Sequence, residues 1–218
     1  IFEQAHAYNR ALYKTAYPLM EYERVPGYHE ALAVTENEMI GYLKIDRIGV
    51  ELPIYHTTSD EVLNKGVGHL QGSSLPVGGE GTHSVLSAHR GLPTAVLFTN
   101  LDRMEIGDTF YFTILDRTIT YEVDQILIVE PHETQALQIV EGEDLCTLIT
   151  CTPYGVNSHR LLVRGHRVEN QETAVSVRVT ANATQIEPAI VAPILAIPML
   201  LVLLIGGIDI SIGATLAL

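Results

Sequence analysis

Apolar and polar residues alternate along several short segments of the chain, as they do in β-strands with one buried face. The alternation is clearest over Thr109–Leu115, where Phe110, Phe112 and Ile114 occupy every second position. Similar runs begin near residues 40, 51, 84, 118, 145 and 160. Seven or eight short strands with few helices predict a mainly β protein, either a barrel or a sandwich with antiparallel or mixed pairing.

A short amphipathic helix is predicted before the first of these strands. Apolar residues between Phe2 and Leu12 fall on one helical stripe, and Pro18 then prevents a long continuous helix. The alternating pattern starts near Met39. We therefore interpret residues 1–38 as an N-terminal helical arm that lies over a globular domain.

Two further helices are predicted between strands. Thr58–Glu61 fits a capping box in front of two apolar residues, so we expect a short helix that ends at the glycines that follow. Thr94–Met104 carries apolar residues at helical spacing, which predicts a helical connection between two strands.

The last part of the chain differs from the rest in composition. Residues 169–188 are polar and have the character of a linker. Residues 189–208 carry no charge and are long enough to cross a bilayer, so we predict a transmembrane helix followed by a tail over 209–218. The start at Ile1 instead of a methionine leads us to expect that residues preceding it were removed.

Charge excludes one class of function. The 218 residues include 26 acidic and 13 basic side chains, which gives a formal net charge of −13. Such a chain repels the phosphates of nucleic acids and offers no polybasic patch to an anionic membrane surface. We therefore expect no nucleic-acid partner and a substrate that is not a polyanion.

Two cysteines lie five positions apart in one β-type run. Their odd separation points Cys146 and Cys151 to opposite faces of a strand, where they cannot form a disulfide. Cys151 ends the run just before the turn residues Thr152–Gly155, and a thiol in that place is either a nucleophile or a small buried core residue. Cys146, inside the run, fits the core. Neither has the spacing of a zinc ligand.

A histidine and an arginine are the candidate partners of Cys151. His89 ends a β-type run and begins a loop rich in glycine and proline, whereas His159 would point away from its neighbour Arg160. Arg160 opens the strand after Cys151, where a guanidinium favours a thiolate and a developing oxyanion. Arg164 lies on the same face and is its internal rival.

Three motifs in order resemble the sortases, and within them the class C, pilus-assembling group. They are the segments Leu86–Pro93, Leu97–Asp102 with Gly107-Asp108, and Thr147–Arg164. The resemblance covers residues 39–168. A His-containing loop, a Thr-Leu-x-Thr-Cys strand and an Arg that begins the next strand are the catalytic trio of that family. They correspond here to His89, Cys151 and Arg160.

The resemblance implies an eight-stranded β-barrel over residues 39–168 and a transpeptidase that needs no cofactor. Cys151 would attack the Thr–Gly bond of an LPxTG-like sorting signal, His89 would protonate the leaving amine, and Arg160 would stabilise the oxyanion or hold the substrate backbone. A lysine of a pilin subunit would then take the acyl group. Such enzymes are commonly held in the membrane by a C-terminal helix, with the catalytic domain outside a Gram-positive cell.

The resemblance also suggests where the peptide and the arm lie. We expect Thr150, Thr152 and Tyr154 to contact the sorting peptide. Class C sortases usually carry an N-terminal lid anchored by an Asp-Pro-aromatic motif. This chain has Tyr17-Pro18-Leu19 instead, so we assign the lid contacts to Tyr17, Pro18 and Tyr22.

Two other functions remain open at this point. One is a sortase of another class that anchors surface proteins to the cell wall, or that releases the acyl group to water as an endopeptidase does. The other is a membrane-tethered β-barrel that binds a surface peptide without catalysis.

Overall fold

The structure is a computed structural model that describes residues 1–33, 38–91 and 96–170. The predicted linker from residue 171 onward, the predicted transmembrane segment over 189–208 and the tail over 209–218 lie outside the described residues. Within the described ranges, no helix is long and apolar enough to cross a membrane.

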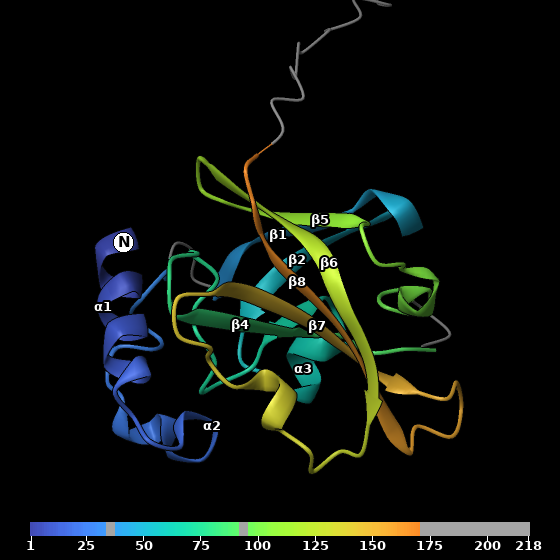
Figure 1. The fold of residues 1–218 in the computed structure, drawn as a ribbon, viewed down its shortest axis with the longest axis horizontal. Helices are drawn as coiled ribbons and strands as arrows, with labels where there is room; N and C mark the ends of the chain where they lie inside the picture. The colour runs from blue at the N-terminus through green and yellow to red at the C-terminus, as the bar shows by residue number, and fades with distance from the viewer. Residues whose placement is uncertain (34–37, 92–95, 171–218) are drawn as a thin grey trace, which may run out of the picture. The chain divides into compact units, whose positions relative to one another are not determined.

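Eight strands form a closed barrel in the order β1-β2-β3-β4-β7-β8-β6-β5 (Figure 1). The strands are β1 Met39–Ile45, β2 Val50–His56, β3 Val67–His69, β4 Thr82–Ser87, β5 Thr109–Ile114, β6 Arg117–Val129, β7 Asp144–Thr152 and β8 His159–Val168. The predicted mainly β class and the eight-stranded barrel are confirmed. The three-residue strand β3 was not predicted, because it is too short to show an alternation.

The barrel mixes parallel and antiparallel pairs. β2 pairs with β3 and β4 pairs with β7 in parallel, and the other neighbours are antiparallel. β7 therefore lies between β4 and β8, and Figure 1 shows β4 and β7 side by side. Because β4 and β7 run in the same direction, both reach the same end of the barrel, where β8 begins.

The alternating side chains of β5 fill the barrel interior. Phe110, Phe112 and Ile114 are each 0% exposed, and both phenylalanines stack on Tyr121 of β6 at ring distances of 5.7 and 5.4 Å. Aromatic side chains bury large apolar areas and gain from such offset packing. The hydrophobic pattern read from the sequence therefore marks the inward face of the sheet.

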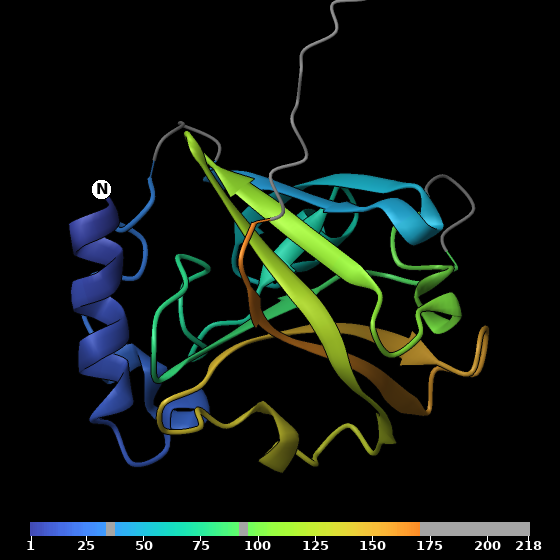
Figure 2. The same ribbon diagram turned by 45° about the horizontal axis from the view of Figure 1, so that its top comes forward.

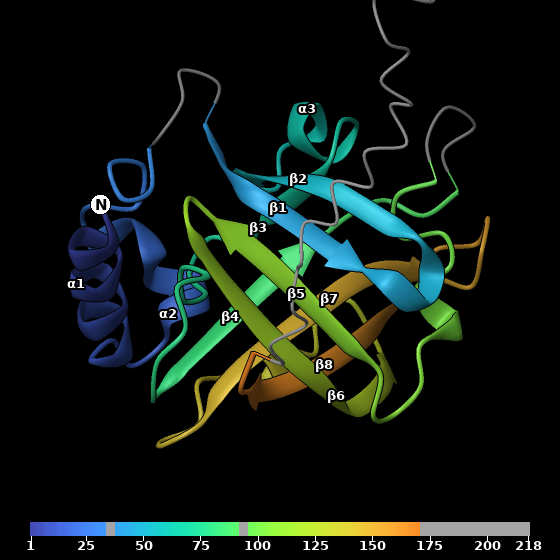
Figure 3. The same ribbon diagram turned by 90° about the horizontal axis from the view of Figure 1, so that it is seen from above.

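The N-terminal arm packs against the barrel as one body with its core. It contains α1 Phe2–Tyr13, α2 Pro18–Glu21 and the 3-10 helix η1 Tyr22–Arg24. The predicted apolar stripe of α1 is confirmed, since Ala5, Tyr8 and Leu12 are buried in the same apolar cluster as the barrel interior. Figures 2 and 3 show α1 on one side of the barrel.

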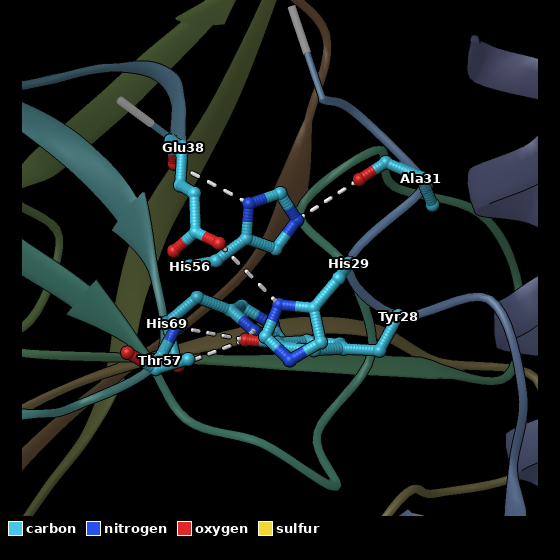
Figure 4. Close-up of polar contacts among 7 residues, drawn as sticks. All are labelled: Tyr28, His29, Ala31, Glu38, His56, Thr57 and His69. Atoms are coloured by element: carbon cyan, nitrogen blue, oxygen red, sulfur yellow. Dashed lines mark hydrogen bonds and ion pairs between the residues drawn. The ribbon is translucent and has the colours of Figure 1, made fainter. Parts of the chain in front are cut away.

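A polar cluster joins the end of the arm to the barrel. This arm cluster consists of Tyr28, His29, Glu38, His56 and His69 (Figure 4). The Tyr28 hydroxyl accepts a hydrogen bond from the Thr57 main-chain N–H at 3.1 Å and donates to His69 Nδ1 at 2.9 Å. Both ring nitrogens of His56 face main-chain carbonyls, of Ala31 at 2.9 Å and of Glu38 at 3.3 Å.

Burial favours the neutral form of two imidazoles of the arm cluster, those of His56 and His69. His69 is completely buried, and the loss of solvation lowers its pKa to about 4. Burial lowers the pKa of His56 as well, against the opposing effect of its two carbonyl partners. The Tyr28 hydroxyl, whose pKa burial raises, stays protonated and can donate its hydrogen bond.

Short helices connect the strands. They are α3 Asp60–Leu63, η2 Asp46–Ile48, η3 Leu101–Arg103 and η4 Gln135–Leu137. The predicted short helix is confirmed, but its N-cap is Ser59, whose Oγ accepts a hydrogen bond from the Val62 N–H at 3.4 Å, and not Thr58 as a capping box over Thr58–Glu61 requires. The helix predicted over Thr94–Met104 is wrong in its described part: turns precede η3, and Leu97 has a positive φ of 39° that breaks a helix.

Candidate active site

A cleft at the ends of β4, β7 and β8 contains the three side chains that the sequence singled out for catalysis. Its volume is about 440 Å³, and His89, Cys151 and Arg160 are among its lining residues. All three are half-buried, so each can be reached by a substrate. The fold thus brings together residues that lie far apart in the sequence, while their catalytic roles stay predictions.

The two cysteines have opposite environments on β7. Cys151 pairs directly with Arg160 across the antiparallel β7–β8 ladder and is half-buried. Cys146 is 0% exposed and belongs to the apolar core, and burial raises the pKa of its thiol well above the usual value. The prediction that Cys146 is a core residue is confirmed, and both cysteines are free thiols.

Arg160 and Arg164 of β8 have different hydrogen-bond partners. The Arg160 guanidinium donates through Nη1 to the carbonyls of His159 at 3.0 Å and Asn157 at 3.2 Å, which holds it beside the β7–β8 loop. Arg164 is engaged elsewhere, in two 2.9 Å hydrogen bonds to the carboxylate of Asp124. Such a bidentate pair fixes a guanidinium in place. Arg160 is therefore the arginine that faces the cleft.

His89 lies two residues after the end of β4 and is held by its main chain. Its carbonyl accepts a hydrogen bond from the Phe98 N–H at 3.1 Å. In the part of the chain that the structure describes, neither ring nitrogen of His89 has a hydrogen-bond partner. An imidazole without partners in a cleft can exchange a proton with a bound substrate.

The three residues expected to contact the substrate differ in accessibility. Thr150 lines the cleft but is 1% exposed, and its hydroxyl donates to the Ala88 carbonyl at 2.9 Å. Thr152 is 8% exposed and is also hydrogen-bonded within the protein. Tyr154 is 61% exposed, and its ring lies over Gly91. The substrate contact assigned to each stays a prediction, and Tyr154 is the most accessible of the three.

One residue of the arm reaches the cleft. Leu19 is among the residues that line it, whereas Tyr17 and Pro18 line a neighbouring groove of about 510 Å³. Tyr17 is 67% exposed, and Tyr22 is among the lining residues of neither space. The sequence analysis did not select Leu19, although it directly follows the proline that starts α2. The lid role of Tyr17, Pro18 and Tyr22 stays a prediction.

A second residue that the sequence analysis did not select is Arg90. Its side chain is 9% exposed and donates to the carboxylate of Asp102 at 2.6 Å and to Thr152 Oγ1 at 3.3 Å. Arginines are mostly exposed, so a sequence pattern alone indicates a surface residue here. The feature of the sequence that could have pointed to Arg90 is its position directly after His89.

The arrangement is suited to acyl transfer. A thiol at a strand end can attack a carbonyl, an imidazole can protonate the departing amine, and a guanidinium can stabilise the negative charge that forms on the carbonyl oxygen. Over the described ranges, no group of three or more His, Cys, Asp or Glu side chains is placed to hold a metal ion.

Comparisons of the sequence identify relatives of this chain. A family model described as Sortase domain matches residues 43–168. Sortase D of Bacillus subtilis (strain 168) is 32% identical over 131 residues, which are 59% of this chain and 63% of that protein. Sortase A of Bacillus anthracis is 26% identical over 136 residues, which are 62% of this chain and 63% of that protein. The chain thus spans less than two thirds of the length of these relatives.

Solved structures give a closer match. Sortase C1 of Streptococcus agalactiae is 48% identical with a TM-score of 0.72, over 78% of this chain and 89% of that chain. Sortase C of Streptococcus pneumoniae is also 48% identical, with a TM-score of 0.68 over 76% and 85% of the two chains. Because the family model covers more than half of the sequence, the chain belongs to the sortase family, and its structural neighbours are class C sortases.

Proposed function

We propose that this protein is a cysteine transpeptidase that cleaves an LPxTG-like sorting signal and joins the acyl part to a lysine amine of a pilin subunit. The observation that carries the proposal is the meeting of His89, Cys151 and Arg160 in one cleft on a sortase barrel. The similarity to class C structures supports the pilin acceptor, since the Streptococcus pneumoniae sortase C is described in terms of pilin substrate specificity.

In the first half of the reaction, Cys151 Sγ attacks the threonine carbonyl of the sorting signal. The carbonyl oxygen becomes an oxyanion, which the Arg160 guanidinium stabilises. The C–N bond to glycine then breaks, and His89 gives its proton to the departing amine. A thioester between Cys151 and the threonine carbonyl remains.

In the second half, an amine attacks this thioester. His89 takes the proton from the attacking amine, the C–S bond breaks, and Cys151 is released for another cycle. A new amide joins the two proteins, so no net hydrolysis occurs and no cofactor is required. Water in place of the amine would give a free acid instead.

We also propose that the catalytic domain works outside the cell and is attached to the membrane. The uncharged segment over residues 189–208 supports this location by its length and composition. A protease added to intact cells would digest a catalytic domain on the outer face and spare one on the inner face.

The test of the function compares two acceptors. An LPxTG peptide is incubated with the protein, with and without a purified pilin subunit, and the products are identified by mass spectrometry. We expect a pilin–peptide amide when pilin is present and a thioacyl adduct on Cys151 when it is absent. Free acid alone in both samples would favour a hydrolytic or wall-anchoring sortase, and peptide binding without any adduct would favour a non-catalytic adaptor.

A further inference from the structure

The residues on either side of Cys151 are bonded to the residues on either side of His89. On one side, the Thr150 hydroxyl donates to the Ala88 carbonyl at 2.9 Å. On the other side, Arg90 Nη1 donates to Thr152 Oγ1 at 3.3 Å. The nucleophile and the proposed acid are therefore the central members of two three-residue segments that are tied together at both ends.

The tie through Arg90 lies beyond the end of the strand pairing. The parallel register between β4 and β7 ends at Ser87 and Ile149, and one main-chain bond follows, from the Ala88 N–H to the Ile149 carbonyl at 3.2 Å. Beyond that point the contact between the two segments continues through side chains. The residues before His89 are connected to β7 by main-chain hydrogen bonds. Beside His89, the Arg90 guanidinium continues this connection.

Stability alone gives little reason for an arginine in this place. The Arg90 side chain is 9% exposed, and its Nε–H is buried without a hydrogen-bond partner in the described part of the chain. A buried donor left unpaired is unfavourable, and apolar replacements of buried ion pairs are often neutral or stabilising. Asp102, the charged partner, is 48% exposed and would stay solvated if Arg90 were removed.

We propose that Arg90 is a positioning residue, which uses Asp102 as its anchor and Thr152 as its contact to hold His89 at the correct distance from Cys151. The inference rests on the function proposed above. It does not require that Arg90 touch the substrate, and the cleft is lined by His89 and Arg160 but not by Arg90.

Removal of either end of the tie tests the proposal. We expect Arg90→Met and Thr152→Val each to lower kcat for an LPxTG peptide by about 10-fold to 100-fold, because small misplacements of reacting groups have effects of this size. KM of Arg90→Met should change by less than about twofold, since Arg90 does not line the cleft and uniform substrate binding is retained. Thr152→Ser, which keeps the hydroxyl, should retain most of the wild-type kcat.

A double variant tests whether the two residues act as a unit. If Arg90 acts through Thr152, the Arg90→Met/Thr152→Val protein should be no less active than the less active of the two single variants. Arg164→Met is the matched control, because it also removes one arginine from a partly buried ion pair, that with Asp124. It should leave kcat within about twofold of wild type.

The pH dependence of Cys151 alkylation gives a readout that needs no peptide. A loosened His89 assists the thiol less, so the rate of iodoacetamide alkylation along the pH profile should fall by about twofold or more. We expect this fall in Arg90→Met and Thr152→Val but not in Thr152→Ser or Arg164→Met. This measurement remains informative even if the peptide or acceptor proposed above is wrong.

Three results would overturn the inference. They are unchanged kcat and unchanged alkylation profiles in both single variants, a rise in KM without a fall in kcat, and additive losses in the double variant. Melting temperatures within about 3 °C of wild type are expected and separate positioning from unfolding. If Arg90→Met fails to fold, Thr152→Val carries the same test.

Discussion

The arm cluster and the candidate catalytic cleft hold histidines in opposite surroundings. His56 and His69 are 1% and 0% exposed, and their ring nitrogens lie against carbonyls or hydroxyls. His89 is half-buried, and its ring has no hydrogen-bond partner among the described residues. An imidazole whose two ring nitrogens are both hydrogen-bonded within the protein cannot transfer a proton to a ligand without breaking one of these bonds. An imidazole without such partners can. The number of ring hydrogen bonds therefore distinguishes the buried histidines His56 and His69 from His89, the candidate catalytic histidine.

The two cysteines give the largest expected contrast of this kind. Cys151→Ala should lower acyl transfer by at least about 1,000-fold, because no other described thiol lies in the cleft. Cys146→Ala should keep the activity and lower the free energy of unfolding by about 1–2 kcal/mol through the cavity it leaves. Peptide turnover and urea unfolding of both variants make the comparison. Substantial turnover by Cys151→Ala would exclude the cysteine mechanism.

The arm cluster should make the stability of the protein depend on pH. His69 has an ordinary pKa of 6.5 when unfolded and a pKa of about 4 in the fold, so the folded state binds fewer protons between these values. Its stabilising contribution is complete above pH 6.5 and is lost as the pH falls through this window. By pH 4 the loss in the free energy of unfolding should reach about 3 kcal/mol.

Urea unfolding at a series of pH values measures this loss. The groups that face His69 and its neighbour His56 are Tyr8, Tyr28, His29 and Glu38, and all are kept in the experiment. His132→Gln is the control, because the His132 side chain is 78% exposed. It should leave the slope unchanged. A wild-type stability that is flat between pH 7 and pH 4 would contradict the neutral, buried state of the cluster.

Gly91 offers a smaller test on the cleft side. It has a φ of +79°, and a Cβ there would lie 2.7 Å from Tyr154 Cε2. Gly91→Ala should therefore lower stability by about 1–2 kcal/mol and also reduce turnover several-fold, since it displaces the β7–β8 loop. Gly107→Ala is the matched control, with a φ of +91° and nothing within 4 Å of the added Cβ. Similar turnover in Gly91→Ala and Gly107→Ala would mean that the contact between residue 91 and Tyr154 does not affect turnover.

The smallest effect concerns the part of the arm that reaches the cleft. Leu19 lines the cleft, so Leu19→Ala should raise the rate of Cys151 alkylation by about twofold to fivefold if the arm limits access. Met20→Ala is the control, because Met20 is 81% exposed. Equal rates in wild type and Leu19→Ala would mean that Leu19 does not restrict access to the thiol.

The barrel was largely predictable because its strands alternate in hydrophobicity. Phe110, Phe112 and Ile114 mark one buried face in the sequence and fill the interior in the structure. The same kind of argument failed for Thr94–Met104, where Leu97, Phe98 and Leu101 are buried but Val96 is 60% exposed and Leu97 has a positive φ. The spacing of apolar residues predicts which side chains are buried more reliably than it predicts the secondary structure of the segment.

The site was predictable only where its residues end or begin strands. His89, Cys151 and Arg160 have such positions, and the closed barrel brings those strand ends together. Leu19 and Arg90 could not be assigned in this way. Their burial depends on tertiary contacts, of the arm with the cleft and of a guanidinium with Asp102, that no local pattern records.

The pairing of β4 with β7 has a further consequence for how the protein folds. The Ala88–Thr150 hydrogen bond joins residues 62 positions apart, and β7 is the seventh strand along the chain. Barrels built from such distant pairs have high contact order and typically fold in milliseconds to seconds. During synthesis, β4 can pair with β3 early, but the emerging chain must wait for β7 before Cys151 lies beside His89. The candidate nucleophile Cys151 and the candidate proton donor His89 therefore meet only when the domain is nearly complete.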